Sequence, residues 1–248
     1  MAEYDRHFAC SESFKNYYWV YPARTLLGNF NTLIRWTHHC PPRPSLEHHF
    51  PAHKEFFANR DAIKQEALYV FNNLRLPSFN QVDSFFDSIA DDRWKTFIML
   101  WYGDMLENCK HAPITSALVS KYRDQIGCAM FSILQPGTRI PPHKGPCAAA
   151  LRYHLCLQVP KRGTARIRVD REWITYAEGG EYLFDDGYEH EVIVDAPADD
   201  DVRIVLFMDI IRNMKQPLKW AADKIAKNAT FADFVKTINA NGEVKQKI

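Results

Sequence analysis

Short alternating segments separated by turn residues fill the region from residue 127 to residue 211. Successive side chains of a strand point to opposite faces, so such alternation indicates strands, and Gly, Pro and Asp between them indicate turns. Seven segments fit this pattern, namely GCAMFSILQ, AAALRYHLCLQVP, TARIRVD, REWITYA, EYLFDD, HEVIVDA and DVRIVLFMDI. Short strands at this density are typical of a sandwich, a jelly roll or a small barrel. The sequence therefore predicts a mainly β core.

The flanks of this core show helical spacing. Apolar residues recur at helical intervals in 54–73, which predicts a helix there, and a shorter helix is expected over 113–124. Within the aromatic-rich and Pro-rich residues 1–53, the stretch HHCPPRPSLEHHFP reads as an extended connector, and further on RWKTFIMLWYG is strand-like. Apolar residues at helical spacing in 213–240 predict a further helix that packs outside the core.

The organisation expected from these patterns is one domain over residues 1–248. Residues 1–126 would form an N-terminal helical and aromatic flank packed on the core, and residues 127–212 the core itself. Residues 213–248 would form a C-terminal helical extension.

Composition excludes several classes of protein. The formal net charge is +1, so nothing in the overall charge favours binding to nucleic acid. No apolar run approaches the roughly 18 residues of a membrane helix, and MAEYDRHFAC lacks the apolar core of a signal peptide. The six cysteines are scattered without a CxxC pair, which favours free thiols. We therefore expect a cytoplasmic protein without a transmembrane segment.

Polar residues fall on strand faces that are otherwise apolar. Arg152 and His154 share a face with Cys156, while Ser132 and Arg203 each alternate with apolar neighbours on their own strands. A buried polar group is stable only when it is paired or holds a ligand. One inward arginine could be a structural ion pair, but two of them near histidines favour a pocket for an anion beside a metal.

Two histidines are candidate metal ligands. His143 follows PGTRIPP, and His190 ends FDDGYEH further along the chain. In a jelly roll, two such positions on different strands can meet inside the mouth of the barrel. Two His and one carboxylate are the usual ligands of non-haem Fe(II) oxygenases. The motif here is His143-Lys144-Gly145, without the carboxylate, which on this generic rule counts against iron.

Three segments together resemble the aspartyl/asparaginyl β-hydroxylase family: SILQPGTRIPPHKGPCAAALRYHLCLQVP, FDDGYEHEV and RIVLFMDI. The resemblance is tight over 127–212 and scattered upstream. It implies a double-stranded β-helix, which is a cupin-like jelly roll, and a dioxygenase that uses Fe(II), 2-oxoglutarate and O2. The family carries Gly in place of the carboxylate ligand, so Gly145 matches it.

The resemblance also implies roles for individual residues. His143 and His190 match the two iron ligands, and Arg203 matches the arginine that binds the distal carboxylate of 2-oxoglutarate. A planar guanidinium suits that role because it can form two parallel hydrogen bonds. Further cosubstrate contacts are matched by Arg152, His154, Ser132 and Trp94. His154 could equally be a packed core residue.

Two further expectations concern the surroundings of the metal. Acidic residues near His190, among them Asp185, Asp186 and Glu191, are candidates to orient the imidazole rings. The substitution Gly145→Asp is expected to add a carboxylate ligand, tightening metal binding and impairing hydroxylation; the alternative outcome is a clash with the backbone, because glycine occupies dihedrals that Asp cannot.

The histidines of HHC and HHF, with His53, are an alternative zinc cluster, but they lack the usual ligand spacing and favour a packing role.

The substrate is left open by the sequence. The resemblance implies hydroxylation of an unactivated carbon, foremost the β-carbon of Asp or Asn in a peptide or small molecule. The segment FMDIIRNMKQPLKW also resembles the lipid A 2-hydroxylase branch, which acts on acyl chains, and a natural-product intermediate is a further alternative. A non-catalytic cupin-like binding module is the alternative from another class. The intact His143, His190 and Arg203 argue against that module.

Overall fold

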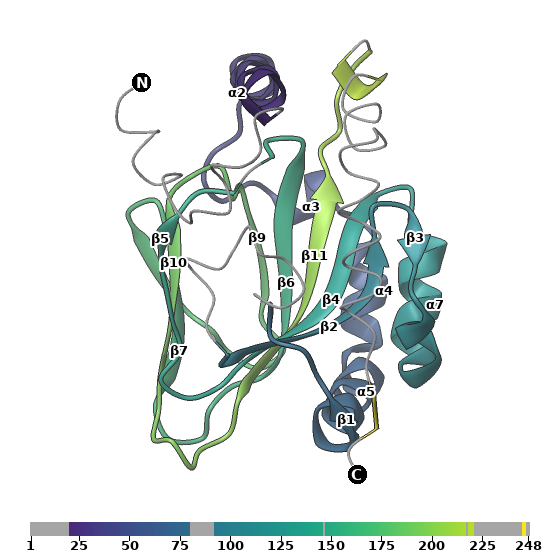
Figure 1. The fold of residues 1–248 in the computed structure, drawn as a ribbon, viewed down its shortest axis with the longest axis vertical. Helices are drawn as coiled ribbons and strands as arrows, with labels where there is room; N and C mark the ends of the chain where they lie inside the picture. The colour runs from purple at the N-terminus through teal and green to yellow at the C-terminus, as the bar shows by residue number, and fades with distance from the viewer. Residues whose placement is uncertain (1–19, 80–91, 146, 217, 221–244, 247–248) are drawn as a thin grey trace.

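Two antiparallel sheets face each other in the computed structural model, which describes residues 20–79, 92–145, 147–216, 218–220 and 245–246 (Figure 1). The larger sheet has the strand order β3-β2-β4-β11-β6-β9, and the smaller has the order β5-β10-β7-β8. The strands are β2 (Trp94–Trp101), β3 (Asp104–Met105), β4 (Ile126–Leu134), β5 (Arg139–His143), β6 (Ala150–Gln158), β7 (Thr164–Val169), β8 (Glu172–Thr175), β9 (Glu181–Phe184), β10 (His190–Asp195) and β11 (Arg203–Ile211). A separate ladder pairs β1 (Leu74–Arg75) with β12 (Lys245–Gln246).

The topology from β4 to β11 is that of a jelly roll. Strands β4, β6, β9 and β11 lie in the larger sheet, while β5, β7, β8 and β10 lie in the smaller one. The chain thus crosses repeatedly between the two sheets, and several neighbouring strands, such as β4 with β11 and β5 with β10, are distant in sequence. The predicted fold class, a mainly β jelly roll with flanking helices, is confirmed. The division into one domain with two flanks remains a prediction.

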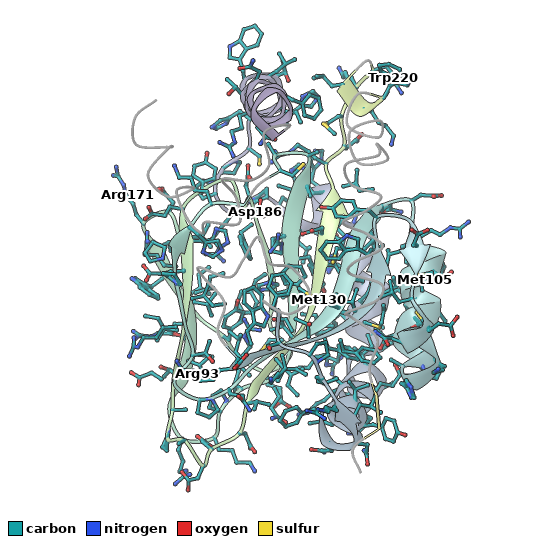
Figure 2. All side chains as sticks on the ribbon, viewed as in Figure 1. Arg93, Met105, Met130, Arg171, Asp186 and Trp220 are labelled. Atoms are coloured by element: carbon teal, nitrogen blue, oxygen red, sulfur yellow. The ribbon has the colours of Figure 1, made fainter. Side chains whose placement is uncertain are left out.

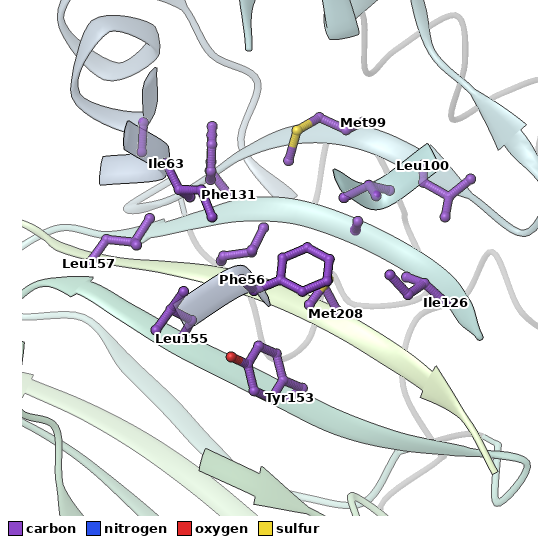
Figure 3. Packing of buried hydrophobic residues seen from close by; sticks show 14 of the residues in the cluster. Phe56, Ile63, Met99, Leu100, Ile126, Phe131, Tyr153, Leu155, Leu157 and Met208 are labelled. Atoms are coloured by element: carbon purple, nitrogen blue, oxygen red, sulfur yellow. The ribbon is translucent and has the colours of Figure 1, made fainter. Parts of the chain in front are cut away.

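Helices cover the outer face of the larger sheet. They are α4 (His53–Ala58), α5 (Arg60–Asn73) and α7 (Pro113–Lys121), whereas α2 (Val20–Thr37) lies at one end of the sandwich (Figure 1). The short α3 (Leu46–His49) and the 3₁₀ helix η3 (Glu107–His111) complete the set. Phe56 and Ile63 from the helices pack against Phe131, Leu155 and Met208 of the sheet (Figure 3). This apolar cluster packs the helices closely against the outer face of the larger sheet.

The predicted helices are found with altered bounds. The helix expected over 54–73 is divided into α4 and α5 at Asn59, whose side chain donates to the backbone oxygen of Glu55 at 2.8 Å. The helix expected over 113–124 is confirmed as α7. The connector expected within 1–53 is wrong in part, because it contains α3. The helix expected in 213–240 lies mostly outside the described residues.

Strand β5 is the element of the core that the sequence reading missed. Its residues RIPPH include Pro141 and Pro142, which read as part of a turn. Proline lacks the N–H that a central strand must donate, so it is confined to sheet edges. β5 lies at the edge of the smaller sheet and pairs with β10 alone. This edge position permits the prolines and brings His143 into the sheet.

None of the helices in the described part of the chain is both long enough and apolar enough to cross a bilayer. The compartment remains a prediction.

Candidate metal and cosubstrate site

His143 and His190 meet across the edge of the smaller sheet. His143 ends β5, His190 begins β10, and the antiparallel register places the two residues opposite each other. Their ring centroids are 4.1 Å apart. The predicted meeting of these two histidines from distant parts of the sequence is therefore confirmed.

The hydrogen bonds of both rings define which nitrogen is available. Nδ1 of His143 lies 2.8 Å from the backbone oxygen of Pro141, and Nδ1 of His190 lies 3.0 Å from that of Tyr188. A carbonyl oxygen can only accept, so each Nδ1 carries the proton and donates. The lone pair of each neutral ring is then on Nε2, the atom that a metal would bind.

Desolvation keeps the two imidazoles neutral. Burial lowers the pKa of His143 to about 4, with a smaller contribution from the positive charge of Arg152. Burial also holds the pKa of His190 well below its usual value, and His143 adds to this effect. Two neutral imidazoles with free Nε2 atoms are the protonation state that a metal site requires. The donor set therefore fits a divalent metal.

The carboxyl group of Asp186 fills the space beside Gly145. A Cβ atom built on Gly145 would lie 2.0 Å from Oδ2 of Asp186, and the Gly145 N–H donates to the Asp186 backbone oxygen at 2.7 Å. The expectation for Gly145→Asp therefore does not hold as stated, because any side chain at residue 145 must first displace Asp186. Across the described ranges, no group of three His, Cys, Asp or Glu forms a metal-binding cluster.

Asp186 is itself an unusual carboxyl group. Its Oδ2 accepts from Nη2 of Arg152 at 2.9 Å, while its buried Oδ1 has no hydrogen-bond partner. Burial raises the pKa of this carboxyl to about 7, although Arg152 acts in the opposite direction. The unpartnered oxygen lies where the loop after His143 meets the loop before His190, so it would be an acceptor for a water or ligand that enters the site.

Arg203 lies at the start of β11 and is only 2% exposed. Its Nη1 donates to the backbone oxygen of Ser132 at 3.2 Å and to its Oγ at 3.3 Å, and Trp94 Nε1 donates to the same Oγ at 3.0 Å. The Nε of Arg203 has no partner, and among the described residues no carboxylate forms an ion pair with it. A buried guanidinium without a counter-charge fits an anionic ligand.

Aromatic contacts connect the histidine pair to Arg203. Phe184 lies 5.5 Å from His190 and 5.3 Å from His154 between ring centroids. Nδ1 of His154 is 2.8 Å from the hydroxyl of Tyr176, and the guanidinium carbon of Arg203 is 5.1 Å from the centroid of the Tyr176 ring. Nε2 of His154 is buried without a partner. These contacts form a continuous row of side chains between the sheets, which runs from the histidine pair to Arg203.

A family model described as aspartyl/asparaginyl β-hydroxylase matches residues 58–213, a span that includes the histidine pair and Arg203. The chain belongs to the aspartyl/asparaginyl β-hydroxylase family. The predicted hydroxylase family is confirmed, and membership implies dependence on Fe(II) and 2-oxoglutarate. The same membership argues against the non-catalytic binding module.

Two relatives show how the similarity is distributed. An ornithine lipid ester-linked acyl 2-hydroxylase of Rhizobium tropici is 37% identical over 191 residues, which cover 75% of this chain and 66% of that protein. The aspartyl/asparaginyl β-hydroxylase of Mus musculus is 40% identical over 122 residues, which cover 47% of this chain and 16% of that protein. The chain thus spans less than two thirds of the length of each.

Among solved structures, an oxidoreductase of the 2OG-Fe(II) oxygenase family from Burkholderia pseudomallei aligns with 75% of this chain and 90% of its own. The identity is 16% and the TM-score is 0.40.

Arg152 of this β-hydroxylase family member is held by two carboxylates. Its Nε donates to Oδ1 of Asp209 at 2.7 Å and its Nη2 to Oδ2 of Asp186 at 2.9 Å. The guanidinium carbon lies 4.1 Å from the centroid of the Phe207 ring. The side chain therefore lies on the inner face of the larger sheet, as predicted, but its charge is already neutralised.

The acidic residues near His190 do not orient the imidazoles as expected. The rings are held by backbone oxygens, Asp185 pairs with Arg212 at 2.8 Å, and Glu191 pairs with Arg168. His53, from the alternative zinc cluster, instead contacts Glu181 at 2.9 Å. These pairs fix the loop before His190 and the entry to β9. Neither Tyr176 nor Arg212 carries a motif signal, so the sequence reading missed both.

Proposed function

We propose that this protein is an Fe(II)- and 2-oxoglutarate-dependent hydroxylase that acts on an acyl chain of a lipid. The observation that carries the reaction class is the pair of neutral imidazoles at one end of a row of contacting side chains, with a buried guanidinium at the other end that has no carboxylate partner among the described residues. Fe(II) bound there would supply oxidation of an unactivated carbon by O2, coupled to decarboxylation of 2-oxoglutarate.

Each of these residues would have a separate role at the site. His143 and His190 would hold the metal through Nε2, with water completing the coordination and Asp186 accepting from it. Arg203 would bind the distal carboxylate of 2-oxoglutarate, positioned by the Ser132 oxygens that its Nη1 contacts. Trp94 would hold the Ser132 hydroxyl in place.

His154 would contact the cosubstrate between the histidine pair and Arg203. Its Nε2 is buried without a partner, and the hydroxyl of Tyr176 contacts its other nitrogen. A hydrogen-bonding ring in this position would recognise a carboxylate or carbonyl oxygen of 2-oxoglutarate. The aromatic residues around it would exclude water from the reacting atoms.

The extent of the similarity supports an acyl chain as the substrate. Similarity to the ornithine lipid acyl hydroxylase covers 75% of the chain, against 47% for the mouse aspartyl/asparaginyl enzyme. Arg152 forms ion pairs with Asp186 and Asp209, but all three residues lie in the segments that resemble the aspartyl/asparaginyl family, so they do not distinguish the two substrates.

The second candidate is hydroxylation of the β-carbon of Asp or Asn in a peptide. The 40% identity to the mouse enzyme over 122 residues favours it. The two candidates require different substrates but the same metal and cosubstrate residues.

The test is to load the protein with Fe(II) under nitrogen and supply 2-oxoglutarate, O2 and one substrate at a time. We expect succinate release and a mass gain of one oxygen on an ester-linked acyl lipid in detergent micelles. No such gain is expected on an Asp-containing peptide, and the His143→Ala variant serves as the inactive control. Hydroxylation of the peptide alone would overturn the acyl assignment. Absence of succinate with every substrate would overturn the reaction class.

A further inference from the structure

Helix α2 and the segment after β11 pack together at one end of the sandwich. Phe30 and Ile34 of α2 contact Met214 and Leu218 in one apolar cluster. Nε2 of His38 lies 3.4 Å from the backbone nitrogen of Lys215. We call residues 29–39 together with 213–216 and 218–220 the cap. The contacts show that its two parts form one surface.

The cap is attached directly to the loops that carry the candidate site. The Ala148 N–H donates to Oδ1 of Asn31 at 2.9 Å, just beyond the loop that contains Gly145. Arg212 links the cap to the other loop, because its Nη1 donates to the His38 oxygen at 3.0 Å and its Nη2 to Asp185 at 2.8 Å. A ligand on the cap would therefore lie next to the loops that carry His143 and His190.

The same arrangement is visible in the figures. Figure 2 shows Trp220 at the end of the molecule where Figure 1 places α2, with Asp186 below them toward the space between the sheets. A Cβ atom at Gly187, the residue after Asp186, would lie 2.8 Å from Nη2 of Arg35 on α2. The cap thus reaches to within contact distance of the loop before His190.

The outward face of the cap is apolar and aromatic. Trp36 is 82% exposed, Trp220 is 60% exposed and Leu33 is 42% exposed, whereas the neighbouring Ile34 is fully buried. Leu33 and Trp36 are three positions apart, so they lie on the same side of the helix. Tryptophan is suited to the boundary between water and lipid, because its ring is apolar and its N–H remains polar.

The charges of the cap are all positive. Residues 29–39, 213–216 and 218–220 include Arg35, Lys215 and Lys219 and contain no Asp or Glu. Lys215 is exposed and Lys219 is half-buried, whereas the adjacent Arg212 is buried and paired with Asp185. The chain as a whole carries a net charge of only +1. Lysines beside exposed aromatic residues are complementary to an anionic bilayer.

We infer that the cap is a docking surface for an anionic lipid bilayer, with Leu33, Trp36 and Trp220 entering the interface. Docking there would bring lipid molecules next to the loops that carry His143 and His190. The inference rests on the proposed function for its purpose, since an acyl substrate resides in a membrane. The docking itself is measurable without turnover.

The experiment is co-sedimentation of the full chain with vesicles of phosphatidylcholine, with and without phosphatidylglycerol. We expect binding to the phosphatidylglycerol vesicles and its weakening by added salt. Trp36→Ala should weaken the affinity roughly tenfold, because a large apolar side chain no longer enters the interface. Lys215→Gln should weaken it roughly fivefold. The matched control is Trp173→Ala on β8, where Trp173 is 44% exposed but remote from the cap in sequence and sheet, and it should bind like the wild type.

Two results would overturn the inference: wild-type protein that stays in the supernatant with phosphatidylglycerol vesicles, or equal affinities for Trp36→Ala and Trp173→Ala. Leu33→Ser provides a second cap variant should Trp36→Ala fail to fold, and Co(II) affinity reports whether each variant is intact. Vesicle binding without acyl hydroxylation would overturn the proposed substrate and leave the docking surface in place. Acyl hydroxylation in micelles without vesicle binding would overturn the docking surface and leave the proposed substrate in place.

Discussion

The two faces of the larger sheet are built from the same strands but differ in chemistry. On β6, Leu151, Tyr153, Leu155 and Leu157 point outward into the cluster beneath α4 and α5, while the alternate residues face the smaller sheet. Those alternate residues are Arg152, His154 and Cys156. The outer face is closed by apolar contacts, whereas the inner face has buried nitrogens on His154 and Arg203 without partners.

Within a single strand, the outward residues therefore stabilise the fold and the inward residues serve binding. Outward side chains stabilise the fold through close packing, so removing side-chain volume there lowers the free energy of unfolding. Inward polar side chains cost free energy unless a ligand meets them, so their presence indicates a binding site. Substitutions on the two faces should therefore alter different measured quantities.

The largest effect is expected at the histidine pair. His143→Ala and His190→Ala should each weaken Co(II) or Fe(II) binding by roughly a hundredfold or more and abolish turnover, because two protein side chains hold the metal. Spectroscopic titration under nitrogen measures the affinity, and the unfolding free energy should change little. An unchanged metal affinity in either variant would remove that residue from the site.

The outer face should respond in the opposite way. Leu155 is fully buried against Phe56 and its neighbours, and Leu155→Ala should lower the free energy of unfolding by about 2–5 kcal/mol. Urea denaturation measures this loss. Metal affinity in the folded protein should remain that of the wild type, and a parallel loss of affinity would show that the two faces are coupled.

A smaller effect is expected at Arg203. Arg203→Lys replaces a two-pronged guanidinium by a point charge, so the KM for 2-oxoglutarate should rise roughly tenfold to a hundredfold, equivalent to about 1.5–3 kcal/mol. Steady-state succinate release measures it. Arg152→Lys is the matched control on the same inner face. A KM that responds to Arg152→Lys and not to Arg203→Lys would exchange the two assignments.

The smallest effect is expected at Tyr176. Tyr176→Phe removes the hydroxyl that contacts Nδ1 of His154, and the KM for 2-oxoglutarate should rise roughly fivefold, equivalent to about 1 kcal/mol. A matched control is Tyr69→Phe, since Tyr69 is 48% exposed on α5. Equal KM values for both variants would remove Tyr176 from the cosubstrate site.

The sequence was sufficient for seven of the eight strands from β4 to β11 and for the residues that share a face within a strand. Alternation grouped Arg152 with His154 on β6 and separated Arg203 from its direct neighbours on β11, because the period of a strand leaves only two faces. The family motif supplied the pairing of His143 with His190, which spacing alone did not establish. The family match over residues 58–213 then confirmed the class of protein.

The features that were missed depend on contacts between distant segments. β5 contains two prolines and reads as a turn, and only its edge position allows it to be a strand. Helix α2 has 18 residues, including Pro22, Gly28 and two asparagines, and a poor helical composition hid it. The closeness of Asp186 to Gly145 joins residues far apart in sequence. No local pattern contains that information.

The most direct test of a metal site with two protein ligands is the structure of the protein loaded with Fe(II) and 2-oxoglutarate under nitrogen. We predict that Nε2 of His143 and Nε2 of His190 are the only protein atoms bound to the metal. The distal carboxylate of 2-oxoglutarate should contact Arg203, and Asp186 should contact the metal only through water. A carboxylate oxygen of Asp186 bound directly to the metal, or a distal carboxylate bound to Arg152 instead, would contradict the account.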